Sequence, residues 1–309
     1  MQTQDPTNDI EFPDDPLTEY PGDEGREEYR GGFLRRLLPI VAFLVLAAFL
    51  AWTLRSTGLL IPRLTADADG RPLTLAGESI PRLPERVLRD GAWQVTYEFW
   101  FDDAIRTVVV RIPQEDYAIS ESRPDGMVVD SSESRDAWTR RYYTRQLEWP
   151  EQERAVETAL AQLRPIRDAL GLSSDDYVRL LNAFVGTIPY DSVTAEAVRP
   201  KRYPCSLLTE GVGVCEDKSM LLGAMLAAEG YDVALLLLES DNHMAVGVRS
   251  DTKSYKGTGY AFIDVVGVYV REPDHEYQEP VDVGKPSEKY VSKPLVVPLT
   301  RGGTRFGVD

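Results

Sequence analysis

The chain has 309 residues, enough for one large domain or two ordinary ones, and its hydrophobic content of 43% is that of a globular protein. Its net charge of −16 excludes the basic surface that nucleic-acid binding needs, so no nucleic acid is expected as a partner. Two cysteines are too few for a disulfide-stabilised scaffold.

Lysine is scarce, because only seven of the 34 basic residues are lysines. An acidic, lysine-poor surface is typical of a halophilic protein, since carboxylates hold water while salt screens their repulsion. A GC-rich genome, which favours arginine codons, predicts the same bias. Both interpretations stay open.

Residues 1–32 form an acidic tail. The first 30 residues contain ten acidic side chains and two arginines, which gives a charge of −8. A segment of this composition cannot bury enough apolar surface to fold, so we expect it to be disordered.

Residues 33–55 predict one transmembrane helix. Leu37–Leu54 is a run of 18 residues without a charge, about 27 Å long as a helix and close to the hydrocarbon thickness of a bilayer. The long acidic leader argues against a cleaved signal peptide, and the lack of a polar face argues against a core helix. Arg35 and Arg36 favour an inside N-terminus and an extracytoplasmic remainder. The bilayer is thus the expected partner of residues 37–54, in a single-pass membrane protein.

Four prolines predict a linker or irregular edge over residues 56–90. Residues 91–150 are expected to be β-rich. "WQVTYEFWF" (93–101) alternates apolar and polar residues as a half-buried strand does, and "AIRTVVVRI" (104–112) returns after a turn at Asp102–Asp103.

Residues 151–280 are expected to form the main core, and residues 281–309 a C-terminal extension. The apolar spacing predicts a helix over 151–170, and Ser173 with Asp176 resembles a capping box that opens a second helix through Phe184. Glu216–Glu229 predicts a third helix, which Gly230 closes.

Cys215 lies at the start of this third helix. Free N–H groups and the positive end of the helix dipole stabilise a thiolate there, and the thiolate is the nucleophilic form of cysteine. Glu216 and Asp217 stand in the same turn and repel a thiolate, so a nearby imidazolium is needed.

His243 can supply that imidazolium. "VALLLLES" and "HMAVGVRS" predict two neighbouring strands, and alternation places His243, Ala245 and Gly247 on one face. Because Ala245 and Gly247 are small, we expect the helix terminus with Cys215 to approach this face.

Asp264 is the candidate for orienting the imidazole. It belongs to the strand "GYAFIDVVG", and a hairpin centred between positions 253 and 254 places it opposite His243 on the same face. Cys215 and His243 each have an ordinary structural explanation when taken singly, as a small buried hydrophobic residue and as a satisfied polar residue. The joint pattern favours nucleophilic catalysis. Cys205, Cys215, His243 and His275 lack the short spacings of a zinc site, so neither a metal nor a cofactor is expected.

Three segments resemble the transglutaminase-like superfamily, and most closely its prokaryotic, largely archaeal membrane-associated members. They are "FVGTIPYD", then "RYPCSLLTEGVGVCEDKSMLLGAMLAAEGYDVALLLLESDNHMAVGV", then "YAFIDVVG". The resemblance is best over about residues 175–270 and rests on a Gly-x-Cys-x-Asp-x-Ser run followed by a histidine strand and an acid strand.

The resemblance implies an α+β fold with a papain-like core, in which the nucleophile helix packs on an antiparallel sheet. It implies Cys215 as nucleophile, His243 as general base and then acid, and Asp264 as the orienting carboxylate. Tyr190 and Tyr203 lie in matched segments, and either could be the second oxyanion donor. Cys205 falls outside the motif and is expected to be structural, although a disulfide with Cys215 is conceivable outside the cell.

The implied reaction is acyl transfer from an amide through a thioester, on a protein or peptide substrate. A membrane-anchored peptidase or amidase is the first interpretation, since water is the default acyl acceptor. A catalytically silent binding or scaffolding domain is the alternative, and cross-linking of envelope proteins is a third.

Overall fold

The computed structural model describes residues 83–124, 126–128, 132–191, 201–266, 268–271, 276–279, 282–286 and 288–307. The predicted acidic tail and transmembrane segment, most of the linker, and His275 lie outside these residues. No helix within the described ranges combines the length and the apolar character needed to cross a bilayer.

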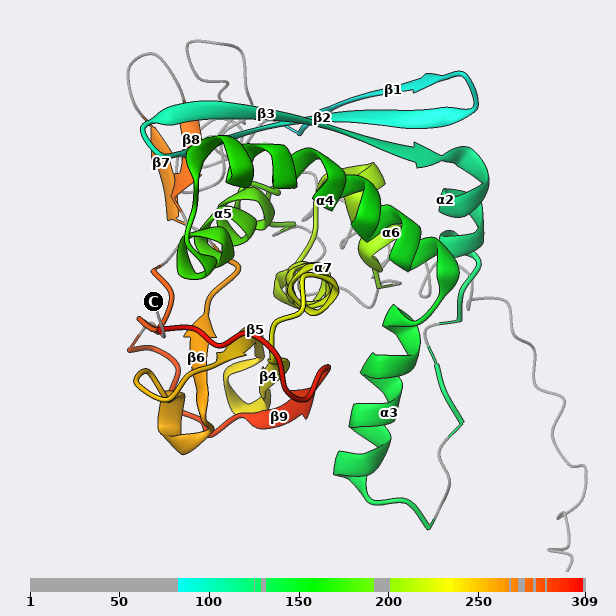
Figure 1. Ribbon diagram of the computed structural model, residues 1–309. Helices are drawn as coiled ribbons and strands as arrows, with labels where there is room; N and C mark the ends of the chain where they lie inside the picture. Colours follow the sequence, from blue (N-terminus) through cyan, green and yellow to red (C-terminus); the bar gives the residue numbers. More distant parts are fainter. Residues whose placement is uncertain are drawn as a thin grey trace, which may run out of the picture. The chain divides into compact units, whose positions relative to one another are not determined.

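Three antiparallel sheets and six α-helices make up the described part, so the fold is α+β as predicted (Figure 1). The first sheet has the order β1-β2-β3, the second β6-β5-β4-β9 and the third β7-β8. The strands are β1 Glu85–Arg89, β2 Ala92–Phe101, β3 Ala104–Pro113, β4 Val233–Leu238, β5 His243–Arg249, β6 Tyr260–Ile263, β7 Val268–Arg271, β8 Glu276–Glu279 and β9 Leu295–Pro298. The helices are α2 Gln114–Glu121, α3 Arg135–Leu147, α4 Pro150–Leu170, α5 Ser174–Gly186, α6 Pro204–Glu210 and α7 Cys215–Ala228.

The hairpin of β2 and β3 forms where the alternation predicted it. Asp102 and Asp103 both have positive φ (54° and 53°), the conformation of a tight two-residue hairpin turn that Asp tolerates better than most residues. The inward side chains Val95, Tyr97 and Phe99 are at most 2% exposed. β1 lies in the segment expected as a linker, and it pairs with β2 as an edge strand.

Helices α4, α5 and α7 lie between the first two sheets, whereas α2 follows the end of β3 and α3 lies beside β9. In Figure 1, α4 and α5 run beneath β2 and β3, and α7 lies between them and the strands β4 and β5. Ser173 caps α5 as predicted, because its Oγ accepts the N–H of Asp176 at 3.1 Å. α4 continues through Pro165 to Leu170. One hydrophobic core includes side chains from β2, β3, α4, α5, α7 and β5.

Helix α7, which begins at Cys215, packs on the opposite face of the sheet from the one expected. Met244 and Val246 of β5 join the core that contains α7, whereas Ala245 packs with Phe262 and Tyr290 in a smaller cluster on the other face. The small face was therefore the wrong guide to the position of α7. His243 still reaches Cys215, because it is the first residue of β5 and lies at the end of the strand.

The hairpin of β5 and β6 also has a different register from the expected one. Val246 pairs with Ile263, which places Asp264 beside Ala245 rather than opposite His243. The shift is two residues, so Asp264 keeps its face, since strand side chains alternate with period two. The loop holds the 3-10 turn Tyr255–Gly257, which makes it asymmetric about the predicted centre.

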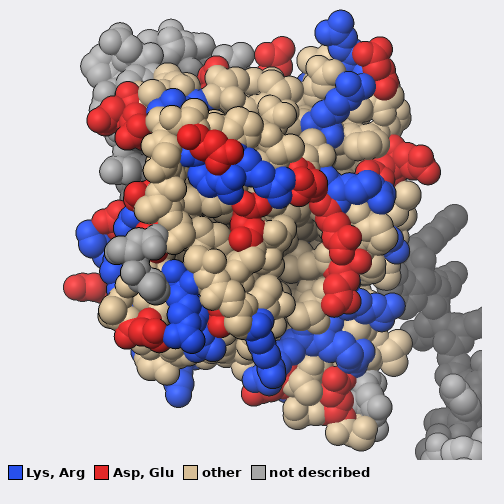
Figure 2. All heavy atoms as spheres, viewed as in Figure 1, with Lys and Arg blue, Asp and Glu red and all other residues tan. Residues whose placement is uncertain are grey.

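Charged side chains of both signs are interspersed on the face that Figure 2 shows. Ion pairs join opposite charges at several places in the described part, for example Arg154 with Asp116 and Arg164 with Glu229. At these places arginine offsets part of the acidic excess.

Candidate active site

Cys215 is the first residue of α7, the position that the sequence predicted. Its side chain is buried, with 9% exposed, and the first N–H groups of the helix have no partners within the helix. Gly213 allows the chain to turn tightly before it. A Cβ at this position would lie 2.6 Å from Leu207 Cδ1, so the close packing of the loop on α6 requires glycine.

Asp217 and Ser219, the other motif residues, fix the helix terminus. The Asp217 carboxylate accepts the N–H of Val214 at 3.0 Å and the N–H of Arg202 at 3.2 Å. The Ser219 hydroxyl donates to the carbonyl of Met244 at 2.9 Å, which ties α7 to the residue after His243. The run therefore sets the position of Cys215 relative to the histidine strand.

The acidic residue next to the nucleophile is neutralised locally. Glu216 accepts hydrogen bonds from the hydroxyl of Tyr143 at 2.7 Å and from the ammonium of Lys201. Burial opposes the charge of Lys201, yet the neighbouring Glu216 carboxylate raises its pKa. Lys201 therefore offsets the repulsion that Glu216 exerts on a thiolate, which the sequence did not reveal.

His243 lies between the thiol and Asp264. Its Nε2 is 3.3 Å from Asp264 Oδ1, and the two side chains are 7% and 4% exposed. At this distance Nε2 makes no well-directed hydrogen bond to any described residue. Catalytic hydrogen bonds often tighten only when substrate binds, and a small movement of the ring suffices here.

The charge state of His243 follows from these neighbours. Burial of the ring lowers its pKa, but interactions with Asp264 and Cys215 outweigh burial and raise the pKa of His243 to about 9. For Asp264 burial acts in the opposite direction, and the interaction with His243 holds its pKa below the usual range. Near neutral pH the imidazole is therefore protonated and the carboxylate ionised.

Tyr290 completes the surroundings of His243. Its ring stacks on the imidazole, with centroids 4.3 Å apart and planes 7° apart. Its hydroxyl donates to Asp264 Oδ2 at 3.0 Å, and the N–H of Val266 donates to Oδ1 at 3.1 Å. Tyr290 comes from the predicted C-terminal extension, where no periodic pattern marked it.

Tyr190, not Tyr203, lies at Cys215. Burial raises the pKa of Tyr190 to about 12, and the charge and side chain of Cys215 raise it too, whereas a hydrogen bond with the Cys215 backbone lowers it. Tyr203 instead packs edge-on against Trp149, at a centroid distance of 5.1 Å. The structure thus separates two tyrosines that the sequence left equivalent.

Cys205 is a core residue of α6. Both cysteines are free, so no disulfide joins Cys205 to Cys215. Burial raises the pKa of Cys205 to about 12, which keeps it in the unreactive thiol form. Within the described ranges, no group of three or more His, Cys, Asp or Glu side chains is placed to hold a metal ion.

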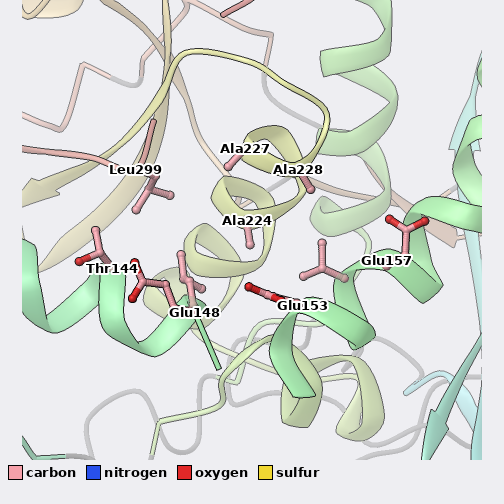
Figure 3. A pocket seen from close by; sticks show the side chains of 10 residues that line it. Thr144, Glu148, Glu153, Glu157, Ala224, Ala227, Ala228 and Leu299 are labelled. Carbon is pink, nitrogen blue, oxygen red and sulfur yellow. The ribbon is translucent and has the colours of Figure 1, made fainter. Parts of the chain in front are cut away.

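A cavity of about 430 Å³ lies elsewhere along α7 (Figure 3). Ala224 and Ala227 form part of its apolar wall, and Glu148, Glu153 and Glu157 lie around it. Ala224 follows Cys215 by nine residues, which is about 14 Å along a helix. This cavity is therefore not the site of the thiol.

No protein-family model matches the sequence, and no curated protein is significantly similar to it. A comparison with solved structures finds one described as a crystal structure of a TGase, a transglutaminase. The two sequences are 16% identical, and the match covers 67% of this chain at a TM-score of 0.28. This chain covers 51% of that protein, about half of its length.

Proposed function

We propose that this protein is a transglutaminase-like cysteine enzyme that cleaves amide bonds by acyl transfer through a thioester. The observation that carries the proposal is the position of His243, whose Nε2 lies 3.3 Å from Asp264 Oδ1 and whose ring also interacts with Cys215. These two neighbours raise the pKa of His243 to about 9. Cysteine nucleophiles are activated by an adjacent base that a third group orients.

The proposed reaction begins with the thiolate of Cys215 and the imidazolium of His243. Sγ attacks the amide carbon, and the C–N bond then breaks as His243 donates its proton to the leaving amine. His243 next takes a proton from water, whose oxygen attacks the thioester. The C–S bond breaks, the carboxylic acid leaves, and the proton stays on His243, which restores the thiolate and the imidazolium. Asp264 stays ionised and holds the ring.

In this proposal the developing oxyanion has two donors. One is the backbone N–H of Cys215, at the helix start, which turns from the Tyr190 oxygen to the oxyanion, and the other is the Tyr190 hydroxyl itself. Water is the expected acyl acceptor, so hydrolysis of a protein or peptide amide is favoured over cross-linking.

A thiol-directed electrophile tests the assignment of the nucleophile. Labelling of the full chain in detergent is expected at Cys215 only, because Cys205 is buried as a thiol. Cys215→Ser is expected to abolish labelling, and Cys205→Ser, the matched control, to leave its rate within about twofold. Labelling that survives the first change and disappears with the second contradicts the proposal, as does a Cys215 that reacts no faster than free cysteine at pH 6.5.

We also propose that residues 37–54 anchor the enzyme in a bilayer, with the catalytic part outside the cytoplasm. The support is the uncharged run of 18 residues in the sequence. The full chain is expected to stay in the membrane pellet after alkaline carbonate extraction, and a variant with Val45 and Leu46 both changed to Arg to be released. Release of the unaltered chain refutes the anchor and leaves the thiol chemistry unaffected.

A further inference from the structure

Lys218 is a buried cation close to the nucleophile. It follows Cys215 by three residues on α7, so both side chains lie on the same side of the helix. It is 0% exposed. Burial of an ammonium group is costly unless hydrogen bonds satisfy it, so a lysine here needs partners that repay its desolvation.

Its partners are main-chain carbonyls at the end of α5. Nζ donates to the oxygen of Gly186 at 3.1 Å and to that of Ile188 at 2.8 Å. The last carbonyls of a helix have no acceptor role within it and need donors from elsewhere. Lys218 thus ties the nucleophile helix to the segment that leaves α5.

That segment leads directly to Tyr190. Beyond Ile188, the carbonyl of Pro189 accepts the N–H of Gly213, and the N–H of Asp191 donates to the carbonyl of Gly213, both at 3.1 Å. Tyr190 is therefore held between two attachments, the Lys218 ammonium on one side and the Gly213 backbone on the other. Its hydroxyl lies at Cys215.

We propose that Lys218 is a positioning residue, which holds the carbonyls of Gly186 and Ile188 and thereby places the Tyr190 hydroxyl against Cys215. The use of that hydroxyl for an oxyanion rests on the proposed function, but its placement does not. Burial lowers the pKa of Lys218 to about 7, whereas Asp264 and Cys215 raise it. Because Nζ carries N–H donors in both its charged and its neutral form, its hydrogen bonds to the two carbonyls do not depend on its charge.

Alkylation of Cys215 by iodoacetamide measures the placement without any substrate. Other groups that bear on the thiol are Tyr143, Lys201 and Glu216 on one side and His243, Asp264 and Tyr290 on the other, and these are left unchanged. In a Cys205→Ser background, Lys218→Met is expected to slow alkylation at pH 6.5 about tenfold and to shift its pH profile upward by about one unit, because the thiolate loses one hydrogen bond.

A double-mutant cycle with Tyr190→Phe separates positioning from a general loss of structure. If Lys218 acts through Tyr190, the double variant is expected to be no slower than Tyr190→Phe alone. The proposal is overturned if the double variant slows by the product of the two single effects. It is also overturned if Lys218→Met lowers the melting temperature but leaves the pH profile of alkylation unchanged, since Lys218 is then a structural residue.

Lys218→Gln provides a second route, because its carboxamide keeps N–H donors without the charge. Alkylation of Cys215 in this variant is expected to slow about threefold. In the Tyr190→Phe background the same change is expected to cause no additional slowing. The same cycle with Gln decides the question if the Met variant does not fold. An unreactive Cys215 in the parent protein would instead count against the proposed function, so the two failures are distinguishable.

Discussion

Replacing His243 with glutamine is expected to slow the alkylation of Cys215 about 100-fold at pH 6.5. The imidazolium, with its pKa raised to about 9, stays protonated through the neutral range and stabilises the thiolate there. Without it the thiol must ionise unassisted. An ordinary cysteine does so near pH 8.5, which leaves about 1% thiolate two units lower.

The pH profile gives the sign of this effect. The advantage of the parent protein over His243→Gln is expected to be full at neutral pH and to be lost as pH rises through about 9, since the proton on His243 is lost there. In His243→Gln the rate is expected to rise about tenfold per pH unit until about pH 8.5. Glu239→Gln, in the turn before β5, is the matched control and is expected to retain the parent profile. A His243→Gln profile that matches the parent would remove histidine from the mechanism.

Replacing Phe184 with alanine is expected to destabilise the protein by about 3–5 kcal/mol. Phe184 is fully buried on α5, and its ring meets Tyr97 and Phe99 of β2 edge-on, at centroid distances of 5.3 and 5.8 Å. Its removal leaves a cavity between the first sheet and the helices, and the aromatic contacts are lost with it.

Denaturant unfolding measures this change in the free energy of unfolding. Val109→Ala is the matched control, because Val109 lies on the outer face of β3 with 43% exposed, and its loss is expected to cost about 0.5 kcal/mol. A cost below about 1 kcal/mol for Phe184→Ala would mean that α5 does not pack on β2 as described.

Periodicity predicted the elements that the site depends on. Three predictions are confirmed: the helix that begins at Cys215, the strand that begins at His243 and the hairpin around Asp102–Asp103. Each has a strong local signal in the sequence, namely an apolar helix bounded by glycines, an alternating strand and a pair of turn-forming aspartates. α2, α3 and α6 were missed, and because α2 and α3 lie within residues 91–150, only the first part of that segment is β-rich. α6 is short, and α3 carries aromatic and arginine residues without a clean apolar stripe.

What the sequence could not supply were contacts between distant segments. Tyr290 lies 26 residues beyond Asp264, and the Lys201–Glu216 pair spans 15 residues. No local pattern marks either contact, since tertiary packing alone brings them together. The register of β5 and β6 failed for a similar reason, because a 3-10 turn inside the loop moved its centre. Because side chains alternate with a period of two, a shift of two residues left Asp264 on the predicted face. Its predicted cross-strand neighbour, His243, was wrong.

The contribution of Tyr290 and β9 has a consequence for biosynthesis. β9 adds to the edge of β4, and Tyr290 holds both the imidazole and its carboxylate, yet these residues follow Cys215 by more than seventy positions along the chain. A nascent chain already carries its thiol for some seventy residues before the histidine acquires its stacking partner. Until Tyr290 has been synthesised, His243 therefore lacks the ring that stacks on it and Asp264 lacks the hydroxyl that donates to it.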